Sequence, residues 1–238
     1  MTGTLINVGA VMAGTTVGVL IGDRLPGRVR ETVFHALGLV TLLIGVANGL
    51  EAFGPELSGV SRASVVIILG SILAGGILGE LLRIESALNR LGDSLKARFG
   101  RGQARFTEGF VVASLVFCVG PLTVLGSIED GLSGSFELLG VKSLLDGFAA
   151  MAFASALGWG VGFSAITVLV YQGILTLSAS ATADAFSPAV VAALTAAGGV
   201  LIMGIGLRLL DLREVRVANL LPALVLAPAA IAVVERIA

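Results

Sequence analysis

Residues 64–82 read SVVIILGSILAGGILGELL, and residues 83–105 read RIESALNRLGDSLKARFGRGQAR, so that an apolar segment runs directly into a basic one. The apolar segment has close to the ~20 residues that an α-helix needs to cross a bilayer. Similar segments recur along the chain, which is 56% hydrophobic and 13% charged, with a mean hydropathy of +1.01. These values exclude an ordinary soluble domain and predict an all-α polytopic membrane protein.

Eight segments are predicted to cross the membrane, so that residues 1–238 form a single transmembrane domain. They cover about residues 4–22, 33–50, 64–82, 109–127, 143–158, 162–179, 189–207 and 218–235. Threaded alternately, they place twelve of the 15 basic residues on one side, in the loops that follow the first, third and seventh segments. Only Arg62, Lys142 and Arg236 fall on the other side. Because basic loops stay in the cytoplasm, both termini are predicted to face outward.

The long apolar stretch from residue 143 to residue 179 allows a second interpretation. As one helix it would reverse the orientation of everything after it, but it would also be ~55 Å long, against a hydrocarbon core of ~30 Å. The sequence Gly158-Trp159-Gly160-Val161-Gly162 provides glycines for a tight turn in the middle. Two helices, and hence eight crossings, are therefore preferred.

The 33 glycines indicate helices that pack closely, since small residues let helix backbones approach one another inside a membrane. Residues 7–18 also align with residues 68–79, with four identical positions among twelve. This alignment predicts hairpin repeats, each a glycine-striped helix followed by a basic loop and a returning helix. The alternative is chance similarity between apolar, glycine-rich helices.

The basic loop at residues 83–106 is the only sizeable segment expected outside the membrane. Its apolar residues Ile84, Leu88, Leu91, Leu95 and Phe99 follow the spacing of an amphipathic helix. Such a helix is expected to lie on the anionic lipids of the cytoplasmic face. A site for a partner protein is the alternative, and nucleic acid is not needed to explain the charge.

A broken helix is predicted at Gly120-Pro121, in the middle of the fourth segment. Proline has no backbone donor and clashes with the carbonyl four residues earlier, so Phe117 should lose its usual hydrogen-bond partner. Discontinuous helices of this kind build midplane binding sites in many transporters. A plain proline kink is the structural alternative.

Three sets of polar residues accompany this break. Glu129 and Asp130 lie in a glycine-rich stretch, residues 126–134, that we expect to form an outer turn and to attract cations, although turn formation alone would also explain it. Asp146 is either a site residue or, as the end of a Ser-x-x-Asp motif, a helix cap. The remaining intramembrane polar residues are Asn7, Gln172 and Asn219, and each could also serve as interhelical glue.

Catalytic and cofactor motifs are absent from the sequence. There is no hydrolase elbow, zinc-protease motif, phosphate-binding loop or haem attachment motif. With one histidine, His35, and one cysteine, Cys118, a transition-metal site built from side chains is not expected. We therefore predict a protein that is not an enzyme and that holds no cofactor or metal, with His35 in a structural role.

Several motifs resemble a known family of bacterial membrane proteins. They are residues 3–9, residues 119–121 running into 126–131, residues 142–147, residues 171–173 and residues 219–222. In these motifs the chain is similar to the family known as domain of unknown function 554 (YdfK/YqgA-like), over residues 3 to about 230. The resemblance implies a multi-pass protein of the bacterial cytoplasmic (inner) membrane and brings no established substrate.

Two classes of function remain. The first is a transporter or channel for an unidentified small solute or ion, with a pathway near the broken helix and the Glu129/Asp130 turn. The alternative is a membrane scaffold or sensor that acts through the basic loop, and a homo-oligomer is compatible with either. The candidate substrate- or ion-binding residues are Asn7, Gly120, Pro121, Glu129, Asp130, Asp146, Gln172 and Asn219.

Overall fold

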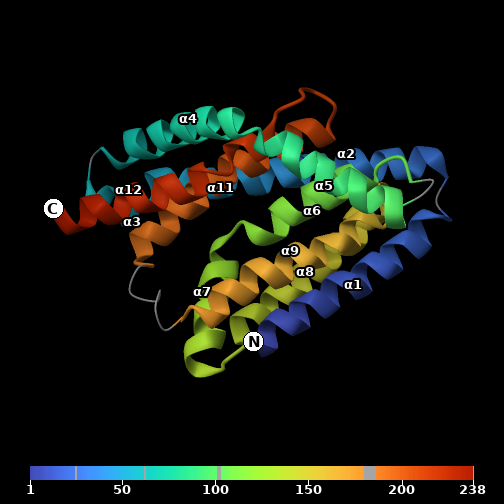
Figure 1. Ribbon diagram of the computed structural model, residues 1–238, viewed down its shortest axis with the longest axis horizontal. Helices are drawn as coiled ribbons and strands as arrows, with labels where there is room; N and C mark the ends of the chain where they lie inside the picture. Colours follow the sequence, from blue (N-terminus) through green and yellow to red (C-terminus); the bar gives the residue numbers. More distant parts are fainter. Residues whose placement is uncertain (25, 62, 101–102, 180–185, 238) are drawn as a thin grey trace. The chain divides into compact units, whose positions relative to one another are not determined.

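The computed structural model describes residues 1–24, 26–61, 63–100, 103–179 and 186–237, and in these ranges it contains helices and no strands (Figure 1). The all-α prediction is therefore confirmed. In chain order the elements are α1 (Thr2–Gly22), α2 (Gly27–Gly49), η1 (Leu50–Phe53), α3 (Pro55–Val60), α4 (Ser64–Leu82), α5 (Ile84–Phe99), α6 (Phe106–Cys118), α7 (Pro121–Ser133), α8 (Glu137–Leu157), α9 (Gly160–Leu177), α11 (Pro188–Leu209), η3 (Val217–Leu220) and α12 (Ala223–Ile237).

Seven helical segments of the described ranges are long and apolar enough to cross a membrane. The pair α6 and α7 would form an eighth crossing, bent by 63° at its break. The long apolar stretch divides at Gly158, whose φ of 80° is one that glycine adopts readily, so α8 and α9 are separate helices. The single-helix interpretation of residues 143–179 is therefore excluded.

The chain forms two compact units. One comprises Met1–Leu37 and Asn89–Ala183, and the other comprises Gly38–Leu88 and Asp184–Ala238. In the first unit α1 packs on α8 and α9, while α6 and α7 pack along α9. In the second unit α12 packs on α4 and α11.

Glycine permits the contact between α1 and α8. A Cβ atom at Gly14, Gly18 or Gly22 would overlap the backbone carbonyl of Gly147, Met151 or Ser155, respectively. Both sets of positions advance by four residues in the same direction, so α1 and α8 run parallel. The predicted glycine-rich packing is thus confirmed at backbone level.

Packing along α9 shows how the broken pair crosses the unit. The first residue of α9, Gly160, contacts the backbone of Phe106 at the start of α6. Near the other end of α9, Thr176 contacts Gly131 in the last turn of α7. The two half-helices therefore accompany α9 over its whole length, as one broken crossing does and a re-entrant loop does not.

The parallel course of α1 and α8 gives a second argument for that crossing. Parallel membrane helices begin on the same side, so an even number of crossings must separate their starting points. The crossings of α1, α2 and α4 make this number even only if α6 and α7 together add one more. This argument favours eight crossings in total.

The predicted repeat has a counterpart in the packing of single helices. Gly9 and its match Gly70 face open space, whereas Gly18 and its match Gly79 each lie against a backbone carbonyl, of Met151 and Asn219 respectively. However, α8 runs parallel to α1, whereas α12 runs antiparallel to α4, because Gly75 contacts Ala223 and Gly79 contacts Asn219. The repeat is therefore visible in the glycine faces of α1 and α4. It does not extend to their partners α8 and α12, which run in opposite directions relative to them.

The topology leads to a first testable prediction. A reporter that is active only in the cytoplasm should be active when fused after residue 102 and also when fused after Arg213. Four crossings separate these two points in the eight-crossing arrangement, so both should lie on one side. Opposite signals would require an odd number of crossings between these two points and would contradict the eight-crossing arrangement.

Candidate polar site at the broken helix

The break between α6 and α7 arises from the residue pair Gly120-Pro121. Gly120 has a φ of 145°, which side chains disfavour, and Pro121 is the first residue of α7. The Phe117 carbonyl, which cannot pair with a proline nitrogen, accepts hydrogen bonds from Lys142 Nζ at 2.8 Å and Thr123 Oγ1 at 3.3 Å. The broken-helix prediction is confirmed, and side chains replace the missing backbone donor.

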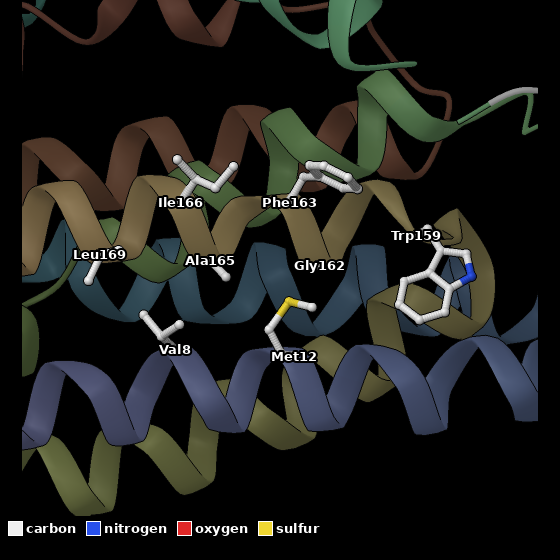
Figure 2. A pocket seen from close by; sticks show the side chains of 8 residues that line it. All are labelled: Val8, Met12, Trp159, Gly162, Phe163, Ala165, Ile166 and Leu169. Atoms are coloured by element: carbon white, nitrogen blue, oxygen red, sulfur yellow. The ribbon is translucent and has the colours of Figure 1, made fainter. Parts of the chain in front are cut away.

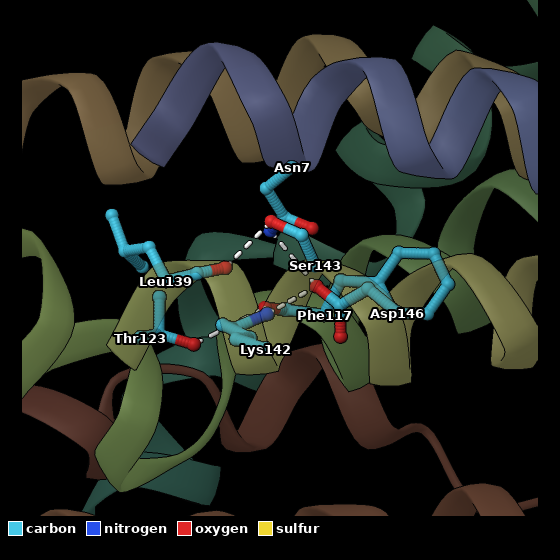
Figure 3. A network of polar contacts seen from close by, with 7 residues as sticks. All are labelled: Asn7, Phe117, Thr123, Leu139, Lys142, Ser143 and Asp146. Carbon is cyan, nitrogen blue, oxygen red and sulfur yellow. Dashed lines mark hydrogen bonds and ion pairs between the residues drawn. The ribbon is translucent and has the colours of Figure 1, made fainter. Parts of the chain in front are cut away.

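Lys142 connects the break to a buried carboxylate. Its ammonium forms an ion pair with Asp146, one turn further along α8, and Asp146 also accepts a hydrogen bond from Asn7 Nδ2 at 2.9 Å. All three side chains are buried, and Asn7 is completely so. Figure 3 shows the resulting network, in which α1, α6, α7 and α8 each contribute a group.

The network is neutral and tightly coupled. Removing two charges from water is expensive, and their mutual attraction offsets this only when further hydrogen bonds complete the pair. Here the Lys142 ammonium donates a further hydrogen bond to the Phe117 carbonyl, and the Asp146 carboxylate accepts one from Asn7. The ion pair thus links the conformation of the break to the contact between α1 and α8.

Two interpretations from the sequence are corrected by α8. This helix begins at Glu137, so Lys142 is a buried helical residue and not part of an outer loop. Asp146 lies well inside the helix, after the N-cap residue Phe136, so it is not a helix cap. The signal that could have identified both is their spacing of four residues in an apolar segment, which places them on one helix face.

Five side chains have buried polar atoms with no partner among the described residues. Two of them are Thr15 (Oγ1) and Glu129 (Oε2). The other three lie on α1, α7 and α9: Asn7 (Oδ1), Ser127 (Oγ) and Gln172 (both amide atoms). Their helices α1, α7 and α9 meet where Thr4 and Thr176 share a hydrogen bond of 3.3 Å and Gly131 lies against Thr176.

Helical periodicity places these three side chains on the helix faces that meet there. Asn7, Ser127 and Gln172 each lie about one turn further into the unit than that meeting point, on the same helix faces. Buried polar groups nearly always find a partner, so this region is suited to water or a polar solute. Ser127 was not singled out from the sequence.

The acidic pair lies in a helix and not in the predicted turn. Glu129 and Asp130 belong to α7, which continues to Ser133. Asp130 is buried, accepts a hydrogen bond from the Gly3 backbone N–H at 3.1 Å, and lies 2.9 Å from the Met1 ammonium. This carboxylate therefore stabilises the N-terminal end of α1.

Asn219 is not part of the network, because it belongs to the second unit. Its Nδ2 donates to Glu80 at 2.6 Å, and its Oδ1 accepts from the Glu85 backbone N–H at 2.7 Å. Arg208 forms an ion pair with the Glu85 side chain at 3.1 Å. Asn219 thus holds the beginning of α5, which covers the stretch predicted as an amphipathic helix.

A separate groove lies between α1 and α9. It has a volume of about 260 Å³ and is lined by Val8, Met12, Trp159, Gly162, Phe163, Ala165, Ile166 and Leu169 (Figure 2). None of these residues belongs to the polar network. A wall of this composition suits hydrocarbon and has no group that could hold an ion.

Comparisons with known proteins agree with this membrane architecture. The chain is 28% identical to the uncharacterised membrane protein YdfK of Bacillus subtilis (strain 168), over 99% of this chain and 97% of that protein. It is 30% identical to the uncharacterised protein YqgA of Escherichia coli (strain K12), over 94% of each chain. No solved structure matches. Residues 2–232 match the model of the family described as protein of unknown function (DUF554), and the chain therefore belongs to that family.

Proposed function

We propose that this protein carries a small solute or ion across the bacterial cytoplasmic membrane, along a path beside the break between α6 and α7. The observation that carries the proposal is the Lys142–Asp146 pair, which is buried in the membrane domain and bonded to the carbonyl freed by Pro121. Ionisable groups at such a depth are expensive, and in membrane proteins they commonly mark substrate or ion pathways.

Two further features support a pathway here. The half-helices α6 and α7 end and begin inside the unit, an arrangement that transporters use at their midplane sites. Asn7, which is bonded to Asp146, has an unpartnered polar atom, and so do Ser127 and Gln172 in the same unit. Transport also requires a change of conformation, and the ion pair couples the break to two other helices.

A scaffold or sensor is the second candidate, and one observation favours it. The beginning of α5 is held by Asn219, Arg208 and the Ala218 backbone N–H, which all bind Glu85. Beyond this anchor α5 exposes Arg90 and Arg98. Anionic lipids of the cytoplasmic face, or a partner protein, could act on the membrane domain through this helix.

Flux into liposomes tests the transport proposal. Purified protein should accelerate the light-scattering change of liposomes that are shifted into isosmotic sodium chloride, potassium chloride, glycerol or glycine. Asp146→Asn should reduce that flux by about tenfold or more, since it removes the charge that orders the break. Leu144→Ala is the matched control, because Leu144 lies on the same helix and is exposed.

Two outcomes of the flux experiment would count against the proposal. A wild-type protein that conducts none of the four probes faster than empty liposomes would contradict transport of these classes of solute. Equal flux from Asp146→Asn and Leu144→Ala would move the pathway away from the polar network.

A further inference from the structure

The Lys142 ammonium occupies a position suited to a bound cation. It lies at the C-terminal end of α6, where the helix dipole is negative, and it contacts the Phe117 carbonyl oxygen and the Asp146 carboxylate. Carbonyl oxygens at the ends of broken helices are also ligands for monovalent cations in membrane proteins. The ammonium is therefore a tethered cation among oxygen atoms.

More oxygen atoms surround this position than Lys142 uses. Thr123 Oγ1 lies 3.3 Å from the Phe117 oxygen, and Asn7 Oδ1 is buried without a partner among the described residues. Rotation of the Asn7 amide would exchange its nitrogen for this oxygen beside Asp146. Carbonyl, hydroxyl and carboxylate oxygens are the ligands that hard cations prefer.

The charge of the site selects the valence of the cation. When the ammonium is withdrawn, Asp146 leaves one negative charge among neutral oxygen donors. A monovalent cation restores neutrality, whereas a divalent cation would leave a buried excess of one positive charge.

Lys142 is placed so that it can leave. It is the sixth residue of α8, about 7.5 Å along the helix from Glu137 at 1.5 Å per residue. A lysine side chain near a helix end can extend to the membrane interface and keep its charge in water. The same side chain can thus either fill the position or vacate it.

We propose that a small monovalent cation of the sodium, potassium or ammonium class binds to the oxygen atoms that the Lys142 ammonium now contacts. Lys142 is then a built-in competitor that fills the position when the cation is absent. This inference rests on the proposed transport function and names its substrate class.

Cation-dependent stability tests the site without any flux. The unfolding temperature of purified protein is measured in sodium, potassium or ammonium chloride, against choline chloride at equal ionic strength. Lys142→Met should be stabilised at cation concentrations about tenfold lower than the wild type. In the wild type the position is open only when Lys142 leaves it, and a position that is open ~10% of the time binds the cation about tenfold more weakly. Lys142→Met with Asp146→Asn should respond equally to all four salts. Leu144→Met should behave as the wild type.

Each outcome bears on the proposal. A wild type that shows no preference for small cations over choline would overturn it, and so would a double variant that keeps the preference of Lys142→Met. If Lys142→Met does not fold, Lys142→Gln retains a donor for the Phe117 carbonyl and takes its place. Cation binding without flux would remove the transport function and leave the site, whereas flux of glycerol alone without cation binding would do the reverse.

Discussion

Replacing Gly18 by leucine should prevent α1 from packing on α8 and should greatly reduce the yield of folded protein. A Cβ atom at this position would overlap the Met151 carbonyl, and one at Gly14 would overlap the Gly147 carbonyl. Backbone atoms cannot turn aside as side chains do, so the destabilisation should exceed the ~1–3 kcal/mol that is typical of overpacked cores. The measurements are the monodisperse yield in detergent and the unfolding temperature.

Gly9 provides the matched control on the same helix. A Cβ atom there would meet no other atom within 4 Å, so Gly9→Leu should retain the yield and unfolding temperature of the wild type. If Gly9→Leu and Gly18→Leu had equal effects, the loss would come from adding bulk anywhere on α1. The close parallel contact with α8 would then be wrong.

Glycine-rich packing and the break are two parts of the fold that could be predicted from local sequence. Both depend on local chemistry, since glycine lacks a side chain and proline lacks a backbone donor wherever they occur. The freed Phe117 carbonyl followed from the position of Pro121 alone. Which group replaces its partner did not, because Lys142 is distant in the sequence and reaches it only after α8 has packed.

Lys142 also shows why the charge pattern misled at one position. The insertion rule treats a lysine near the end of an apolar segment as a loop residue. Here α8 begins at Glu137, five residues earlier, and the charge is compensated by Asp146 inside the unit. For Asn219 the polar character was visible but its role was not, because its partners Glu80 and Glu85 lie more than a hundred residues away.

Removing one member of the Lys142–Asp146 pair should strongly destabilise the protein, whereas removing both should cost much less than the sum. Lys142→Met and Asp146→Leu should each lower the free energy of unfolding by about 3–5 kcal/mol, because each leaves a buried charge without its partner. The double variant leaves no charge behind and loses mainly hydrogen bonds. Denaturant unfolding in choline chloride measures all three without a competing small cation.

The exposed pair Arg216–Glu80 is the comparison that isolates burial. Its side chains are 70% and 56% exposed, against 7% and 11% for Lys142 and Asp146. Solvent screening should limit the loss from Arg216→Met to about 0–1 kcal/mol. Equal losses at both pairs would mean that water reaches Lys142 and Asp146 as freely as it reaches the surface. The ion pair would then not hold the break, and the tethered ammonium would have no position from which a cation could displace it.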